Sequence, residues 1–361
     1  MSVPPRWVRR VVLQPVFILV TALVTALSPL LLLVALMASP FVSGRWRPLR
    51  IAAFTILFMH REVEAILACT CLWLLCLGRV QTPQMQRRHY LLMRWFLSSA
   101  RRWGELLLAV TVQVTDDGFA ETVLAADQRP LLVLSRHSGP GDTFYLVDML
   151  LDRYRREPRI VMKEILKLDP CIDLAGSRLP NYFVPPPLQR RDGSWESSIA
   201  DLSATMNACG ALLLFPEGGN FSEQRRRRRL ALLLRRGRRL DAERAARMHY
   251  VIAPEPGGAL TALNAAPGAD VILIAHGGLS GLGSTGGLFR RAPIDQVFRV
   301  HLWHIERAAI PDGDEAQRQW LLDCWQCIDD WVATDAREAG GVSPLAKVPP
   351  SAPFDAEGAG W

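Results

Sequence analysis

The sequence predicts an α/β fold with a mixed, largely parallel sheet flanked by helices, preceded by an N-terminal membrane-associated helical region. The first observation is an uncharged stretch, Val11–Gly44, near the start of the 361-residue chain. The second is an alternation of strand-like and helix-like segments from about residue 110 onward. The third is that several of these strands are continuous apolar runs, as expected of buried strands.

The uncharged stretch exceeds the roughly 20 residues needed to span a bilayer. The apolar core of a cleaved signal peptide is about 7–15 residues long, which fits less well. We therefore expect residues 1–80 to form membrane-anchoring helices. Pro29 is expected to kink the apolar run or to split it in two. Two shorter apolar runs, 51–59 and 65–78, are together consistent with a second span, a re-entrant pair or helices on the bilayer surface.

The net charge of +7 indicates attraction to anionic lipid. Residues 81–109 interleave arginine with Leu, Trp and Phe, which predicts a basic amphipathic helix at the membrane interface. Each basic residue near such a surface contributes about 1 kcal/mol of attraction. Arginines flank both ends of the long apolar run, so they do not select one topology.

Residues 110–338 carry the alternating pattern. Strands are expected at 110–115, 130–135, 159–163, 182–184, 211–215, 249–253, 271–276 and 297–305. Helices are expected at 142–157, 193–208, 256–266 and 314–337. Residues 339–361 are rich in Pro, Ala and Gly and are expected to be a disordered tail. Cys324 and Cys327 form a lone Cys-x-x-Cys within the last helix, where packing is expected and no metal, because a zinc site normally needs a second ligand pair.

The strand 130–135 leads into Arg136-His137-Ser138-Gly139-Pro140-Gly141-Asp142, which contains the first candidate site. A strand-to-helix turn of this length can place the His137 imidazole beside the Asp142 carboxylate. A general base for an alcohol needs that pairing. The alternative is a turn histidine beside an aspartate that only caps the helix.

A second block, Phe215-Pro216-Glu217-Gly218-Gly219, follows the strand 211–215. Ligands of open α/β sheets bind outside the carboxyl ends of the strands. The two glycines permit close approach of backbone N–H groups to a phosphate, although an ordinary turn is the alternative. Two weaker blocks are Met162-Lys163-Glu164 and the segment from Tyr182 to Arg190 and Arg191. A further strand, 249–253, ends at Pro254.

Two other features have alternative interpretations. The run Arg225–Arg229, with further arginines up to Arg239, is either a solvated face or a contact for anionic lipid or for nucleotide phosphates. His276 ends a strand, and core packing is favoured over a place in the site.

The order of the blocks resembles the glycerolipid acyltransferase family, whose best-known members are the 1-acylglycerol-3-phosphate acyltransferases. The family signature is a His-x4-Asp block, an aromatic strand ending in Arg, a Phe-Pro-Glu-Gly block and a strand ending in Pro. Here these fall at 137–142, at Phe183 with Arg190 or Arg191, at 215–218 and at 251–254. The segment from Val300 to Leu321 is similar to the lysocardiolipin-type branch. The resemblance covers about residues 110–335.

The resemblance implies direct acyl transfer. His137 would take the proton from an acceptor hydroxyl that attacks an acyl thioester, and Asp142 would orient His137. The donor would be acyl-CoA or acyl-carrier protein, and the acceptor a lysophospholipid, by default lysophosphatidic acid, with no metal or other cofactor. Membrane lipids would be partners, nucleic acid would not, and the catalytic domain would lie on the cytoplasmic face. The substrate-binding candidates are Arg136, Lys163, Arg190, Arg191, Phe215, Pro216, Glu217, Gly218, Gly219 and Pro254.

The chain departs from the family pattern at three places. Arg136 stands where Asn is usual, and Gly219-Asn220 stands where Thr-Arg usually follows Phe-Pro-Glu-Gly. Prolines separate Phe183 from the arginines of the second block. Arg136, Lys163 and Arg190 could compensate, or the head group could differ. The main alternative is a non-catalytic membrane protein that binds lipid with the same fold. A serine hydrolase fits less well, because 278–282 lacks the last glycine of Gly-x-Ser-x-Gly.

Overall fold

The computed structural model describes residues 3–338 except 80–81, 127, 187–193 and 278–294. Within these residues the strands form one seven-stranded sheet in the order β1-β7-β6-β2-β5-β3-β4. The strands are β1 (Thr111–Asp116), β2 (Leu131–Ser135), β3 (Glu157–Lys163), β4 (Tyr182–Val184), β5 (Gly210–Leu214), β6 (Asp270–Gly277) and β7 (Val297–Ile305).

The neighbouring strands pair in parallel except β6 and β7, which are antiparallel. The predicted mixed, largely parallel sheet is therefore confirmed. The strands β2, β3, β5 and β6 point the same way, so their carboxyl ends share one edge of the sheet. Both candidate blocks follow strands that end at this edge.

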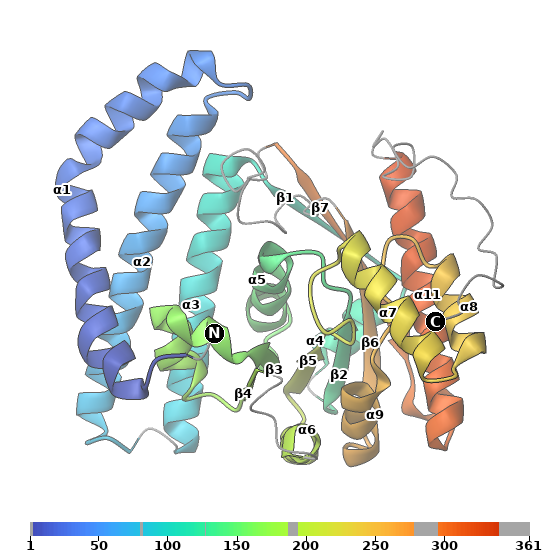
Figure 1. The fold of residues 1–361 in the computed structure, drawn as a ribbon. Coiled ribbons are helices and arrows are strands. Elements are labelled where there is room, and N and C mark those ends of the chain that lie inside the picture. The colour runs from blue at the N-terminus through green and yellow to red at the C-terminus, as the bar shows by residue number, and fades with distance from the viewer. Residues whose placement is uncertain (1–2, 80–81, 127, 187–193, 278–294, 339–361) are drawn as a thin grey trace.

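Helices cover both faces of the sheet (Figure 1). Leu131 and Val133 of β2 belong to a core shared with α2, α3 and α5, whereas Leu132 and Leu134 belong to a second core shared with α6, α8, α9 and α11. This burial on both faces explains why β2 is apolar without interruption. The helices are α1 (Gln14–Ala38), α2 (Arg47–Leu75), α3 (Pro83–Leu108), α4 (Ala120–Ala125), α5 (Pro140–Asp148), α6 (Ser194–Ala204), α7 (Glu223–Arg235), α8 (Arg239–Arg247), α9 (Pro256–Ala265) and α11 (Asp314–Glu338).

The first three helices lie side by side, with α2 between α1 and α3 (Figure 1). Pro29 does not split α1, which bends along its course (Figure 1). The apolar runs 51–59 and 65–78 belong to one continuous helix, α2. Its polar interruption is accommodated because Glu62 turns into the protein, where its side chain is buried and accepts a hydrogen bond from the Cys171 backbone N–H at 3.2 Å.

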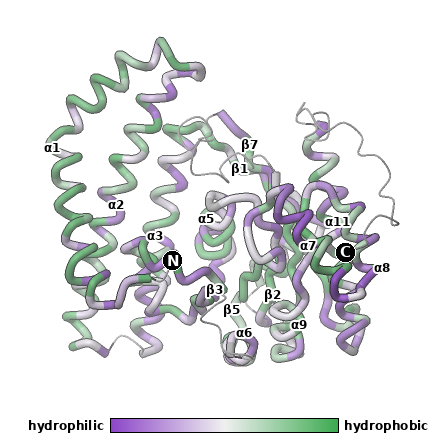
Figure 2. Tube along the Cα trace, in the orientation of Figure 1, coloured by the Kyte–Doolittle hydropathy of each residue, from purple (hydrophilic) through white to green (hydrophobic). Residues whose placement is uncertain are grey.

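One helical segment among the described residues, Val8–Phe41 with 34 residues, is long and apolar enough to cross a membrane. Figure 2 shows hydrophobic colouring along most of α1, whereas α7 is hydrophilic in its arginine-rich first half and hydrophobic at residues 230–234. Many large apolar side chains of α1 are exposed, among them Leu19, Leu23, Leu30, Leu33, Val34 and Met37. In contrast, α3 buries one face against the domain, including Tyr90, Phe96 and Leu97.

The predicted strand at 249–253 is wrong. These residues are buried in part but pair with no strand. Carboxylates from elsewhere bind their backbone instead: Asp329 of α11 accepts hydrogen bonds from the N–H groups of His249 and Val251 at 3.0 Å. The Glu217 side chain accepts one from Ile252 at 3.2 Å. An apolar segment can thus be buried without joining the sheet when side chains satisfy its N–H groups.

Two other boundaries differ from expectation. The arginine-rich stretch after residue 222 forms two helices, α7 and α8, that the sequence pattern did not predict. The helix expected at 142–157 is α5, which continues in a π-helical turn only to Arg153. It ends early because β3 already begins at Glu157, which pairs with Gly210 of β5.

Candidate active site

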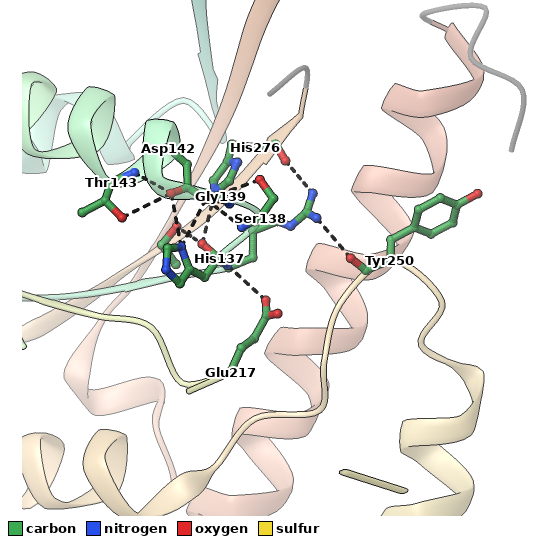
Figure 3. A network of polar contacts seen from close by, with 10 residues as sticks. His137, Ser138, Gly139, Asp142, Thr143, Glu217, Tyr250 and His276 are labelled. Atoms are coloured by element: carbon green, nitrogen blue, oxygen red, sulfur yellow. Dashed lines mark hydrogen bonds and ion pairs between the residues drawn. The ribbon is translucent and has the colours of Figure 1, made fainter. Parts of the chain in front are cut away.

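The turn between β2 and α5 brings His137 and Asp142 together (Figure 3). Asp142 lies in the first turn of α5, where a carboxylate is favoured by the partial positive charge of the helix N-terminus. Its Oδ2 accepts hydrogen bonds from the backbone N–H groups of Ser138 at 2.7 Å and Gly139 at 2.8 Å. These bonds fold the loop back, so that Nδ1 of His137 lies 3.2 Å from Oδ1 of Asp142.

The contacts keep Asp142 ionised although its side chain is fully buried. Burial acts to raise its pKa, but the hydrogen bond with His137 and the hydrogen bond from the Gly139 N–H lower the pKa below its usual value. An ionised carboxylate at Nδ1 assigns the proton of a neutral imidazole to Nδ1 and leaves Nε2 as an acceptor. The His137 side chain is 17% exposed, and its ring lies 4.5 Å from that of Phe215.

The loop after β5 is attached directly to this turn. The Phe221 N–H donates a hydrogen bond to the His137 carbonyl oxygen at 2.7 Å. Gly218 has φ +68°, a conformation that a glycine adopts without strain, and its N–H closes a tight turn to the Phe215 carbonyl. Pro216 is buried, and its carbonyl accepts a hydrogen bond from the Glu255 N–H at 2.7 Å.

Glu217 lies beneath the loop and is only 6% exposed. Its Oε1 accepts a hydrogen bond from the His137 N–H at 3.3 Å, while Oε2 accepts the one from Ile252. Glu217 therefore links three segments: the turn after β2, the loop after β5 and residues 249–253. Burial raises the pKa of Glu217 to about 8, and the charge of Arg136 and the two N–H donors only partly oppose this rise.

The raised pKa predicts a pH dependence of stability. A carboxyl group whose pKa is higher in the folded protein contributes stability below its unfolded value, 4.5, and loses that contribution as pH rises through about 8. The wild-type unfolding temperature should therefore fall between pH 5 and pH 8 more steeply than that of Glu217→Gln, which cannot ionise. Thermal unfolding of both proteins across this range measures the two slopes, and equal slopes would contradict the assignment.

Arg136 and His276 are also buried beside the turn. The Arg136 guanidinium donates hydrogen bonds to the carbonyl oxygens of His276 at 2.7 Å and Tyr250 at 3.1 Å. These bonds hold the guanidinium inside the protein. His276 Nε2 lies 3.1 Å from the Arg136 carbonyl and 3.6 Å from Asp142 Oδ2. Burial lowers the pKa of His276 to about 4, which keeps this ring neutral beside Asp142.

The other predicted site residues are distributed as follows. Lys163, at the end of β3, is exposed, and its Nζ comes close to Gly219. Pro254 is buried, and its carbonyl accepts a hydrogen bond from Arg229. Arg190 and Arg191 lie outside the described residues. Arg225 of α7 also reaches Gly219, a contact that the sequence indicated only as part of an arginine run.

A hollow of about 420 Å³ lined by Arg129, Asp270 and Arg307 does not belong to this site. Arg129 precedes β2 and Asp270 begins β6, so the hollow lies at the opposite edge of the sheet from His137.

The part of the chain that contains this arrangement is similar to a known protein family. No curated protein matches the chain. Residues 112–257, which include His137, Asp142 and the loop after β5, match the family model described as Acyltransferase, so this part of the chain is similar to that family.

Proposed function

We propose that the protein is a membrane-bound O-acyltransferase that moves a fatty acyl group from acyl-CoA or acyl-carrier protein to the hydroxyl of a lysophospholipid, with lysophosphatidic acid as the default acceptor. The observation that carries the proposal is the buried, ionised Asp142 at Nδ1 of His137, which leaves Nε2 available as a base at the carboxyl edge of the sheet. The lysocardiolipin-type branch belongs to the same proposal, through the sequence of β7 and α11.

In the proposed reaction, His137 of this turn carries out both proton transfers. The acceptor hydroxyl gives its proton to Nε2 of His137 as its oxygen attacks the thioester carbonyl carbon, forming a tetrahedral intermediate. When the intermediate collapses, the C–S bond breaks and the sulfur takes the proton from the imidazolium, which leaves an ester and a free thiol. Asp142 stabilises the positive charge that His137 carries between the two transfers.

A second part of the proposal concerns the membrane. Arg9, just before α1, pairs with the buried Asp173 of the domain at 2.7 Å. Arg50, at the start of α2, donates hydrogen bonds to the Leu107 carbonyl at 2.6 Å and to Asp295 at 3.1 Å. The segment before α1 and the start of α2 are thus tied to the same folded unit. The helix α1 runs alongside α2 (Figure 1). We infer that the exposed apolar face of α1 enters one leaflet, without crossing the bilayer, and that the domain faces the cytoplasm.

An epitope inserted at Gly44, between α1 and α2, tests this topology. In sealed membrane vesicles that contain the full chain, we expect a protease to reach this epitope and a second epitope at the C-terminus from the same side. Vesicles opened with detergent provide the control. Access to the two epitopes from opposite sides would show that α1 crosses the bilayer.

The proposed activity is tested with the purified full-length protein in detergent. Labelled acyl-CoA is offered with lysophospholipids that differ in head group, including lysophosphatidic acid and monolysocardiolipin, and His137→Ala is assayed in parallel. Transfer to an acceptor that is lost in the variant would support the proposal. No transfer from acyl-CoA or from acyl-carrier protein by folded protein would contradict it and favour lipid binding without catalysis.

A further inference from the structure

The loop after β5 contains a glycine that is covered by a cation. Gly219 is buried, although Gly218 beside it is exposed. A Cβ added to Gly219 would overlap Nη1 of Arg225 and would lie 3.1 Å from both the Arg225 Cζ and the Lys163 Nζ. Two basic side chains, one from the end of β3 and one from the first turn of α7, therefore meet at a single point of the loop.

This point belongs to the same edge of the sheet as His137. The strands β3 and β5 are neighbours, so Lys163 and the loop after β5 lie beside each other. The loop itself is hydrogen-bonded to the His137 carbonyl through Phe221, and Phe215 packs against the His137 ring. A group bound over Gly219 would therefore be close to the base.

Arg225 differs from Arg226, Arg227 and Arg229 of the arginine run. Arg226 donates hydrogen bonds to the carbonyls of Met248 and Ala246, and Arg229 is buried with bonds to Ala253 and Pro254. Arg227 pairs with Glu223. The exposed Arg225 side chain makes no hydrogen bond or ion pair with another residue that the structure describes, and its guanidinium lies against Gly219.

Two acidic side chains of the surrounding segments are engaged with other groups. Glu223 pairs with Arg226 and Arg227, and Glu255, which approaches Gly218, pairs with Arg229 at 3.5 Å. The surface over Gly219 is therefore locally basic, and the Lys163 and Arg225 side chains that form it are exposed.

We propose that Lys163 and Arg225 bind a phosphate group of a substrate over Gly219, and that residue 219 is glycine because Arg225 occupies the space of its side chain. The identity of the substrate in this inference rests on the proposed acyl transfer. The binding of phosphate by two cations does not depend on it. A guanidinium presents paired N–H donors that match two phosphate oxygens, and an ammonium adds a compact charge. The phosphate belongs to the acceptor head group or to the donor.

Kinetics of Arg225→Ala distinguish these two sources. We expect the variant to raise KM by about 10- to 100-fold for the substrate whose phosphate it binds, since one charge-assisted contact is lost. If that substrate is the acceptor, KM rises for lysophosphatidic acid but not for a monoacylglycerol of the same chain. If it is the donor, KM rises for acyl-CoA but not for acyl-pantetheine. Arg227→Ala, which removes the same charge from the same helix, is the control. Equal KM values in the two variants would overturn the proposal.

A binding measurement keeps this test independent of turnover. Inorganic phosphate or glycerol 3-phosphate should raise the unfolding temperature of the wild type and of Arg227→Ala but not of Arg225→Ala, whereas glycerol should raise none of them. A protein without acyltransferase activity that still shows this pattern would refute the proposed function and retain the phosphate site. Equal stabilisation of all three proteins by phosphate, or of none, would refute the site.

Gly219→Ala provides a second variant. The atoms nearest to its Cβ are the flexible ends of Arg225 and Lys163, so we expect the fold to persist and the guanidinium to be displaced. The KM change should match that of Arg225→Ala, and the double variant should show no further rise, because both changes remove one interaction. Gly268→Ala, where an added Cβ meets nothing within 4 Å, is the matched control. Fully additive effects would overturn the link between the two residues.

Discussion

Replacing His137 with alanine is expected to lower kcat by about 10²–10⁴-fold, the usual contribution of a positioned general base. The imidazole is partly exposed and is held by one carboxylate and one ring contact, so its loss should leave the fold intact. The unfolding temperature of the variant should stay close to that of the wild type. Steady-state transfer by the purified proteins, with unfolding curves for each, measures both effects.

Two further experiments test whether the loss of activity is specific to the imidazole. Because the missing group is an imidazole, added imidazole should restore part of the activity of His137→Ala. His137→Gln should be as inactive as the alanine variant, although it fills more of the space beside Phe215. Wild-type kcat in a folded His137→Ala protein would exclude the proposed mechanism.

Asp142→Ala is expected to lower both kcat and stability, because this carboxylate has two tasks. It orients His137, and it accepts the N–H groups of Ser138 and Gly139 inside the protein. Each buried N–H left without an acceptor costs about 1–3 kcal/mol. We expect kcat to fall by about as much as in His137→Ala, within the range of about 10²–10⁴-fold, together with a lower unfolding temperature that His137→Ala does not show.

Asp142→Asn separates the two tasks. The amide oxygen can still accept a backbone N–H, but its NH₂ group favours a proton on Nε2 of His137, which then cannot act as a base. This variant should therefore lose activity and keep more stability than Asp142→Ala. A variant with normal kcat would show that Asp142 serves only as a helix cap.

The pH dependence of the unfolding temperature, compared between the wild type and Asp142→Ala, provides a further test of Asp142. Its pKa is lowered in the folded state, so its contribution to stability is present above the ordinary value of 3.8 and is lost as pH falls. The difference in unfolding temperature between the wild type and Asp142→Ala should thus be full near neutral pH and shrink in acid. A difference that is independent of pH would contradict an ionised Asp142.

Most of the sheet could be predicted because its strands are short apolar runs separated by polar turns. The strands β2 and β5 are buried on both faces, and both lead into loops with a distinctive residue pattern. The approach of His137 to Asp142 could also be predicted, since it depends on a five-residue turn. The prediction of a strand at 249–253 was wrong because the hydrogen-bond partners of this segment, Asp329 and Glu217, come from distant parts of the chain.

The candidate site shows the same division between local and distant contacts. Arg136 was expected to face a substrate, but its guanidinium turns inward to carbonyls that follow it by more than 100 positions in the chain. In the sequence, Arg225 is one arginine among several in a run. Its contact with Gly219 depends on the direction in which α7 leaves the loop. Where the family pattern places an arginine after Phe-Pro-Glu-Gly, this chain has Asn220, and the structure brings a cation to the loop from the helix instead.

The sequence by itself determined the α/β class, the edge of the sheet at which the candidate residues gather, the His137–Asp142 turn and the apolar character of the first helix. These properties follow from the composition and spacing of residues that are close in the chain. Only the tertiary structure decided which carboxylates satisfy the 249–253 segment, that the segments before and after α1 are tied to the domain, and which arginine covers Gly219. Those contacts join residues far apart in the chain, and they form only when the packing of the helices on the sheet brings the partners within hydrogen-bonding distance.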